Sequence, residues 1–178
     1  MHIVSGYTVF MMRFLSWLLL IISLGSVSAR AAERLPSPDG PVLLVVSGAI
    51  EQTNAPGEAR FDRAMLEAIG MATLKTSTVW TDGVKTFEGI PLWKVLERVG
   101  ARGSTIVASA LNDYSVEFPL SDAVEHGPLL ALKVDGRVLL PRDKGPIWIV
   151  YPRDSRSALQ DPRYDQRWVW QLTRLHIR

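Results

Sequence analysis

The apolar run at residues 147–151 has a proline on either side, and this limits what it can fold into. Proline has no N–H to donate to a sheet ladder, so Pro146 and Pro152 mark the two ends of a short strand. The residues between them are all apolar or aromatic, which is typical of a buried strand. We therefore expect residues 147–151 to form a short buried strand around which the rest of the domain is organised.

A second apolar cluster, residues 168–172, follows a long polar loop and is expected to be another strand, with Trp168 and Trp170 on one face. The cationic side chains around the two candidate strands are Arg142, Lys144, Arg153, Arg156, Arg163 and Arg167. So many cations indicate one of two arrangements: ion pairs with carboxylates of the same domain, or a binding site for an anion. The carboxylates available for ion pairs in this region are Asp143, Asp154, Asp161 and Asp165. The candidates for an anion site are Arg142, Lys144, Arg153, Arg156 and Arg167.

Turn residues divide the rest of the chain into short segments. We expect strands at residues 42–50, 74–80, 105–111, 114–118, 129–134 and 137–140, with 51–59 as a loop and 81–83 as a turn. Asp-Gly at positions 135 and 136 indicates a tight hairpin. We expect helices at 62–69, at 92–99 and for one turn after Ser121. These segments predict a mostly-β α+β domain with mixed sheets and a few short helices.

The first residues have the features of an export signal. Arg13 precedes a short apolar core at residues 14–24, and small residues around Ala29 and Ala31 form a cleavage site. We therefore predict a signal peptide at 1–31, a linker at 32–41 and one domain at 42–178, with a periplasmic or secreted location. Contact with a membrane is expected only through an uncleaved leader, since the core is short for a spanning helix.

Composition excludes several classes of function. Loss of the leader would remove two arginines and no acid, which takes the net charge from +2 to zero and gives no reason to expect a nucleic-acid partner. The sequence has no cysteine, so disulfides, thiolate metal sites and cysteine nucleophiles are excluded. His126 and His176 have no ligand spacing that predicts a metal site, and no serine lies in a nucleophile-elbow motif.

Four segments in order resemble the sulfite-oxidase-like oxidoreductase molybdopterin-binding domain. They are a segment leading into a helix, a hairpin, a proline-bracketed strand and a closing tryptophan segment, at residues 87–100, 130–141, 146–152 and 167–172. The resemblance covers the chain from about Val42 onward and implies that family's α+β fold. It also implies molybdopterin as the possible cofactor. The chain resembles a short form without the additional dimerisation domain.

Two positions depart from the pattern that the resemblance implies. In the family a cysteine thiolate completes the molybdenum site, and the matching segment here places Thr76 or Thr78 near that position. A threonine hydroxyl is a poor substitute because molybdenum favours a soft thiolate. Trp148 stands where the family has an arginine; it either packs in the core or forms the floor of a pocket for a planar ligand.

Three functions are compatible with these residues. The first is an exported, non-catalytic module that recognises a small anionic or planar ligand, or a partner protein, between residues 76–80 and the loops at 142–167. The second is a molybdopterin-dependent oxidoreductase with atypical, non-thiolate ligation, and the third is a structural accessory subunit. The leader has no Arg-Arg pair for the export of a folded, cofactor-loaded protein, which disfavours the second function. Asn112-Asp113-Tyr114 is expected to be a hairpin turn, with a role in a pocket as the alternative.

Overall fold

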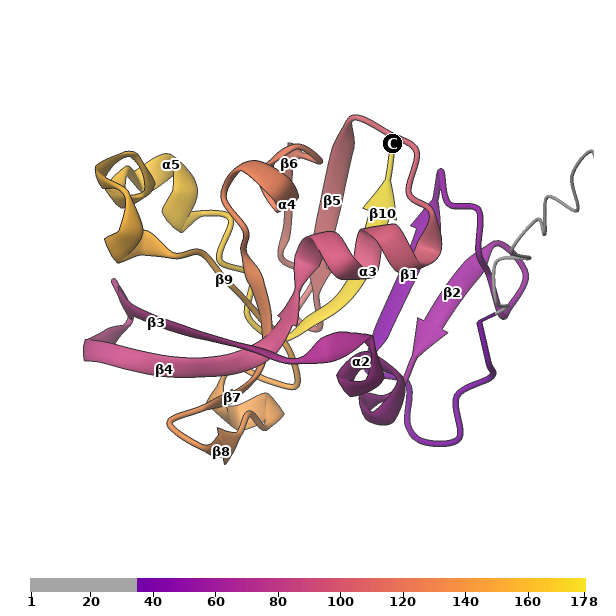
Figure 1. Cartoon of the computed structure of the whole chain (residues 1–178), viewed down its shortest axis with the longest axis horizontal. Coiled ribbons are helices and arrows are strands. Elements are labelled where there is room, and N and C mark those ends of the chain that lie inside the picture. The colour runs from indigo at the N-terminus through magenta and orange to yellow at the C-terminus, as the bar shows by residue number, and fades with distance from the viewer. Residues whose placement is uncertain (1–34) are drawn as a thin grey trace, which may run out of the picture. The chain divides into compact units, whose positions relative to one another are not determined.

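The computed structural model describes residues 35–178, which form a mostly-β domain with two sheets and short helices (Figure 1). The strands are β1 (Leu44–Gly48), β2 (Glu58–Phe61), β3 (Ala72–Thr78), β4 (Thr81–Pro91), β5 (Thr105–Ala110), β6 (Ser115–Pro119), β7 (Leu129–Val134), β8 (Arg137–Val138), β9 (Trp148–Val150) and β10 (Leu172–Ile177). The helices are α2 (Arg63–Gly70), α3 (Leu92–Val99), α4 (Asp122–Glu125) and α5 (Pro162–Asp165), with short 3-10 turns η1 (Pro141–Asp143), η2 (Arg153–Ser155) and η3 (Ser157–Gln160). The predicted α+β class is confirmed.

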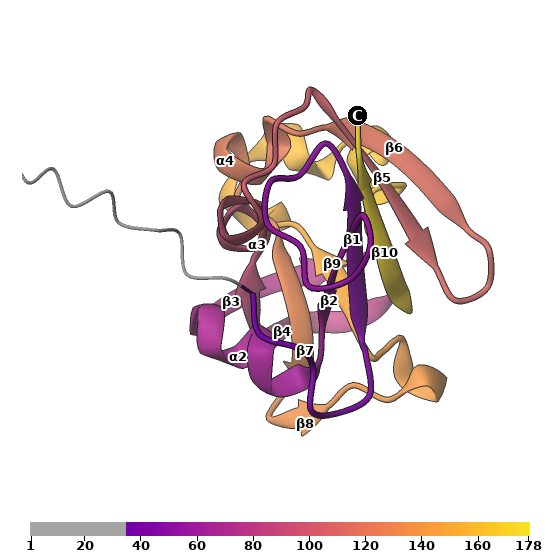
Figure 2. The same cartoon turned by 90° about the vertical axis from the view of Figure 1, so that its right-hand side faces the viewer.

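The first sheet has the order β2-β1-β10-β5-β6. Only the pair β1 and β10 is parallel in it, and the two outermost pairs and the β10–β5 pair are antiparallel. Figure 2 shows β1, β10, β5 and β6 lying side by side. The C-terminal strand therefore closes the sheet by inserting between the first strand and β5.

The second sheet has the order β3-β4-β7-β8, and β9 also pairs with β7. The long strands β3 and β4 form a two-stranded ribbon that extends to the left in Figure 1. Only the second half of β4 pairs with β7. In the part of the chain described here, no helix is long and apolar enough to cross a membrane.

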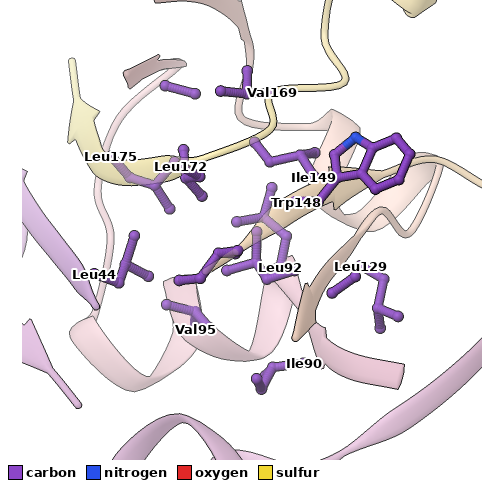
Figure 3. Close-up of a cluster of buried hydrophobic side chains, with 14 of the residues drawn as sticks. Leu44, Ile90, Leu92, Val95, Leu129, Trp148, Ile149, Val169, Leu172 and Leu175 are labelled. Atoms are coloured by element: carbon purple, nitrogen blue, oxygen red, sulfur yellow. The ribbon is translucent and has the colours of Figure 1, made fainter. Parts of the chain in front are cut away.

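Helix α3 forms over the residues that the sequence predicts, and its apolar face is buried. Leu92, Val95, Leu96 and Val99 recur at helical spacing and are all buried. The helix ends at Gly100, whose left-handed backbone (φ 61°) is one that glycine adopts without steric cost. Figure 3 shows Leu92 and Val95 among leucines of the first sheet and the buried side chains of the second. The helix thus forms part of a core that both sheets share.

The proline-bracketed strand is confirmed as β9, and it is buried along its whole length. On one side it pairs with β7, in the register Leu130 opposite Ile149. On its other side the backbone N–H of Ile149 donates to the carbonyl of Val169 (2.9 Å). The strand therefore lies between β7 and the segment that contains the C-terminal tryptophans.

The expectation of a strand at residues 168–172 is wrong. The strand β10 begins only at Leu172, and the preceding Gln171 has a left-handed backbone (φ 53°). Trp168 and Val169 are both buried although they are neighbours, and Trp170 is partly exposed, so the alternation of a strand is absent. The reason is that this segment bonds irregularly to β9 and to its own preceding residues, and regular pairing starts after the kink at Gln171.

Two other local expectations are also wrong. The predicted turn at residues 81–83 belongs to β4, because the chain reverses at Val79 and Trp80 instead. Gly83 (φ 64°) lies where the register shifts between β3 and β4, so the glycine serves a bulge rather than the turn. The predicted loop at 51–59 includes the start of β2, a short edge strand that pairs with β1.

The residues before the first strand contact the domain. Leu35 is buried, and the backbone N–H groups of Asp39 and Gly40 both donate to the Asp62 carboxylate at 2.9 Å. The same carboxylate accepts from the N–H of Met65 and caps α2, as the sequence predicts. The predicted signal peptide lies outside the described residues, and the domain boundaries stay a prediction.

Gly89 lies at the register shift between the paired strands β4 and β7, where the two backbones approach each other closely. A Cβ atom at this position would stand 2.0 Å from the carbonyl oxygen of Leu130 and 2.6 Å from the Cα of Ala131. We predict that Gly89→Ala lowers the free energy of unfolding by about 3 kcal/mol, because backbone atoms must move. Urea unfolding measures this loss.

The matched control is Gly40→Ala, whose new Cβ would meet Asp62 at an ordinary 3.6 Å. Its free energy of unfolding is expected to stay within about 0.5 kcal/mol of the parent protein. Equal stability of the two variants would show that the close approach of β4 and β7 does not exist in solution.

Candidate functional site

The two threonines expected near a metal position are buried at the end of β3, and each is engaged by the protein. Thr76 Oγ1 donates to the carbonyl of Ser77 (3.3 Å) and accepts from the backbone N–H of Asp154 (3.1 Å). Thr78 Oγ1 shares a hydrogen bond with the hydroxyl of Thr81 (2.9 Å) and accepts from the N–H of Trp80 (3.0 Å). Both hydroxyls therefore stabilise the β3–β4 turn and the loop beside it.

Ser77, which the sequence analysis did not single out, binds the Asp154 carboxylate. Its backbone N–H donates to Asp154 Oδ2 (2.5 Å) and its hydroxyl donates to Oδ1 (2.6 Å). These bonds, the hydroxyl's first, hold the pKa of Asp154 below its ordinary value, because they stabilise the charged carboxylate. No local pattern predicts this contact, since the two residues are far apart in the sequence.

Four tryptophans from three segments meet beside this turn. The ring centroid of Trp80 lies 6.4 Å from that of Trp148, 5.7 Å from Trp168 and 5.5 Å from Trp170, all in tilted or edge-on geometry. Trp148 also packs edge-on against Phe87 at 5.3 Å. Trp148 and Trp168 are buried, whereas Trp80 and Trp170 are partly exposed. Trp148 and Trp168 are therefore core residues, and Trp80 and Trp170 form the accessible side of the cluster.

Lys144 places its ammonium group on this cluster. The Nζ atom lies 5.2 Å from the ring centroid of Trp170 and 5.7 Å from that of Trp148. Lys144 has a left-handed backbone (φ 72°), and its carbonyl accepts from the N–H of Gln171 (2.9 Å), which is itself left-handed. No carboxylate forms an ion pair with Lys144 among residues 35–178. The lysine is thus a half-buried cation that rests on aromatic rings.

The candidate arginines do not gather around Lys144 but are bound to protein groups. Arg153 lies 3.6 Å from Asp165, and Arg156 donates to the backbone carbonyl of Glu125 (2.8 Å). Arg167 pairs with Asp122, and Arg142 lies in an exposed pair with its neighbour Asp143 (3.5 Å). These contacts favour the ion-pair interpretation of the cationic region. They leave Lys144 as the cation best placed to meet a ligand.

The Asp122 carboxylate is the centre of a buried polar network. It is 3% exposed and accepts from the hydroxyl of Tyr151 (2.9 Å) and from the guanidinium of Arg167. The Tyr164 hydroxyl lies 3.0 Å from His126 Nε2, and the Arg167 guanidinium stacks 4.6 Å from the Tyr164 ring. Burial, and then the negative charge of Asp122, raise the pKa of the Tyr151 hydroxyl, which therefore stays protonated as a donor.

The Asn112-Asp113-Tyr114 segment forms the expected hairpin turn between β5 and β6. Asn112 Oδ1 accepts from the N–H of Tyr114 (3.3 Å), and Asp113 has a left-handed backbone (φ 65°). The hydroxyl of Tyr114 donates to the carbonyl of Gln166 (2.8 Å), and the N–H of Leu111 donates to that of Gln171. The turn thus contacts the segment that contains Trp170, at the edge of the tryptophan cluster.

The histidines do not assemble a metal centre. His176 shares a hydrogen bond with the hydroxyl of Ser47 (3.0 Å) across β1 and β10, while His126 belongs to the Asp122 network. Among the residues that the structure describes, no group of three or more His, Cys, Asp or Glu side chains is arranged to hold a metal ion. The sequence analysis missed the Asp122 network, because only the fold brings its members together.

The fold and the site define a mostly-β α+β domain with a lysine–tryptophan face. The family model described as the oxidoreductase molybdopterin binding domain matches residues 62–155, which is more than half of the chain. The chain therefore belongs to this family, as its resemblance implies. A comparison with curated proteins finds no significant match.

The residues present do not fit thiolate ligation of molybdenum. The chain has no cysteine, and the Thr76 hydroxyl already donates one hydrogen bond and accepts another within the protein. To become an alkoxide ligand, the hydroxyl would have to give up a very weakly acidic proton and the hydrogen bond that it donates to Ser77. The family's fold is present here without the family's metal-binding side chain.

We predict that Asp122→Ala lowers the free energy of unfolding by about 3 kcal/mol, because it leaves the buried Tyr151 hydroxyl and the Arg167 guanidinium without their acceptor. Urea unfolding monitored by tryptophan fluorescence measures the change. Asp143→Ala, which breaks an exposed pair, is the matched control and is expected to change stability by less than about 0.5 kcal/mol. A similarly small effect at position 122 would exclude the network as a major source of stability.

Proposed function

We propose that this domain is a non-catalytic binding module that recognises a small planar or anionic ligand, or the equivalent group of a partner protein. The binding face consists of Lys144, Trp80 and Trp170. The observation that carries the proposal is the position of the Lys144 ammonium, which lies on two tryptophan rings and has no carboxylate partner among the described residues. A ligand anion would supply that missing partner.

The chemistry of the face suits a flat anion. The partly exposed rings of Trp80 and Trp170 offer apolar surface to a planar group, and aromatic contacts contribute about 0.5–1.5 kcal/mol beyond burial. The neighbouring cation would neutralise a negative charge on that group. Lys144 and Gln171 both adopt left-handed backbones, which costs about 1–2 kcal/mol for a residue with a Cβ. Strain of this kind gathers at functional sites, which supports a role for the face.

The non-catalytic part of the proposal is supported by the residues at the position that resembles the family's metal site. The resemblance implies a protein thiolate on the molybdenum, and here that region contains threonines whose hydroxyls are bonded internally. The binding role does not depend on those hydroxyls. We propose that the family's fold has been retained for recognition.

We also propose that the domain works outside the cytoplasm, either in the periplasm or secreted. The support is the sequence of the leader, with Arg13, an apolar core and small residues at Ala29–Ala31. A chain that crosses the membrane unfolded folds afterwards and meets its ligand in the outer compartment.

A second candidate is a molybdopterin-dependent oxidoreductase with non-thiolate ligation. The observation that favours it is the family match across residues 62–155. Its requirement is that a threonine or a solvent oxygen replaces the thiolate. The two candidates differ in what the natural protein contains, and this can be measured directly.

We expect protein purified from its own exported compartment to contain neither stoichiometric molybdenum nor pterin, because no side chain fits the metal. Elemental analysis and pterin fluorescence on one sample measure both. Folding is checked by circular dichroism, so that an empty protein is not confused with a denatured one. Molybdenum near one atom per chain would exclude the non-catalytic proposal and favour the second candidate.

The binding face is tested with a planar anion and its neutral counterpart, benzoate and benzamide, by quenching of tryptophan fluorescence. We expect benzoate to bind more tightly, and Lys144→Met to weaken benzoate binding about tenfold while leaving benzamide unchanged, since only the charge contact is lost. Lys85→Met, which removes a lysine paired with Asp135, is the matched control. An equal effect of the two lysine variants would exclude Lys144 as the ligand's charge partner.

A further inference from the structure

Near the end of β3, the carboxylate of Asp154 is bound by Ser77, the residue that follows Thr76. Asp154 reaches across from the short turn η2 and accepts two hydrogen bonds from Ser77, one from the backbone N–H and one from the hydroxyl. In the opposite direction, the N–H of Asp154 donates to Thr76 Oγ1 at 3.1 Å. The carboxylate is therefore held at both oxygens by one residue of β3.

The arrangement on Ser77 has the features of an oxyanion site. A backbone N–H and a hydroxyl converge on the two oxygens of one carboxylate at 2.5 and 2.6 Å, both shorter than the commonest distances of neutral hydrogen bonds. The adjacent Arg153 adds positive charge, and its attraction also favours the ionised carboxylate. Both donors belong to β3 itself, which is paired with β4 along its length. The sheet therefore fixes the position of the backbone N–H, and the hydroxyl extends from the same residue.

The group that fills this position is attached by a short exposed segment. Asp154 is exposed, and η2 is a turn of three residues between Pro152 and Arg156. Its other hydrogen bonds are local: the Ser155 hydroxyl and N–H both donate to the carbonyl of Pro152. The contacts with Ser77 and Thr76 are what tie this turn to β3. Arg153 of the same turn lies 3.6 Å from Asp165 in α5, so η2 keeps a contact with the domain when Asp154 leaves Ser77.

We propose that Ser77 forms an oxyanion-binding position and that Asp154 is its built-in occupant, which a small oxyanion such as a carboxylate, phosphate or sulfate can replace. In the region that resembles the family's metal site, the carboxylate of Asp154 thus occupies both hydrogen-bond donors of Ser77. Replacement would release η2 from β3 and expose the position beside Trp80. This site uses donors other than Lys144, so it stands or falls independently of the lysine–tryptophan face.

Chemical rescue tests the proposal. In Asp154→Ala the two donors of Ser77 lose their acceptor, and we expect the melting temperature to fall by several degrees. Added sodium formate, compared with sodium chloride at equal ionic strength, is expected to raise it again by about 3 °C at a tenfold excess over the dissociation constant. The amide resonance of Ser77 is expected to shift with the same concentration dependence.

Two further variants make the test specific. Adding Ser77→Ala to Asp154→Ala removes the hydroxyl donor, and formate affinity is expected to fall about tenfold. Asp143→Ala, which loses an exposed carboxylate elsewhere, is expected to show no effect specific to formate. If Asp154→Ala does not fold, Asp154→Ser, whose side chain is too short to reach both donors, takes its place.

The outcomes separate a binding site from a structural contact. Rescue that saturates and depends on Ser77 supports the oxyanion position. A formate effect equal to that of chloride, or one unchanged by Ser77→Ala, overturns the proposal and leaves the contact with Asp154 as a purely structural bond. The result is independent of the molybdenum content, and the Lys144→Met variant distinguishes benzoate bound at Lys144 from benzoate bound at Ser77.

Discussion

The buried carboxylate of Asp122 is the contact on which the C-terminal part of the domain depends. It accepts from Tyr151, at the end of the central strand β9, and from Arg167, which directly precedes the buried Trp168. A carboxylate in this position is costly to bury unless cations and donors compensate it. Because the compensating groups come from two separate segments, their positions are fixed together. The segment with the C-terminal tryptophans is thereby held against β9.

The tryptophan cluster follows from this arrangement. Trp168 and Trp170 approach from the fixed C-terminal segment, Trp148 from β9, and Trp80 from the reversal between β3 and β4. Their edge-on contacts allow four large rings to share one region while two of them stay partly exposed. Lys144 is then positioned over the cluster by its own backbone and by that of Gln171. The buried rings of Trp148 and Trp168 thus stabilise the core, whereas the partly exposed Trp80 and Trp170 form an aromatic surface beside Lys144.

The chain has the family's fold but no cysteine to supply a thiolate ligand. The sheets and α3 depend on buried apolar side chains, and the matched residues 62–155 include α3 and every strand of the second sheet. The metal chemistry depends on one thiolate, which the sequence lacks. At the corresponding end of β3, the hydroxyl of Thr76 and the donors of Ser77 are directed at Asp154. The core and the end of β3 therefore rest on different side chains, so the fold by itself does not determine what this region binds.

Short-range patterns in the sequence determined the elements whose causes are local. Helix α3 follows from its apolar spacing and from Gly100, the β7–β8 hairpin from Asp135-Gly136, and β9 from its two prolines. The fold class and the family could be predicted from the same segments and their order. The lack of cysteine, with its consequence for metal binding, is likewise a property of the sequence alone.

Tertiary structure decided whatever depends on pairs of residues far apart in the chain. Residues 168–171 have the composition of a strand, but irregular bonding to β9 and the kink at Gln171 prevent one. The cations near the C-terminus look equivalent in the sequence, yet Arg167 is paired with Asp122 while Lys144 rests on indole rings. Which partner each cation meets is set by strand order and register, because a charge interacts with what lies within a few ångströms in space, whatever the separation in sequence.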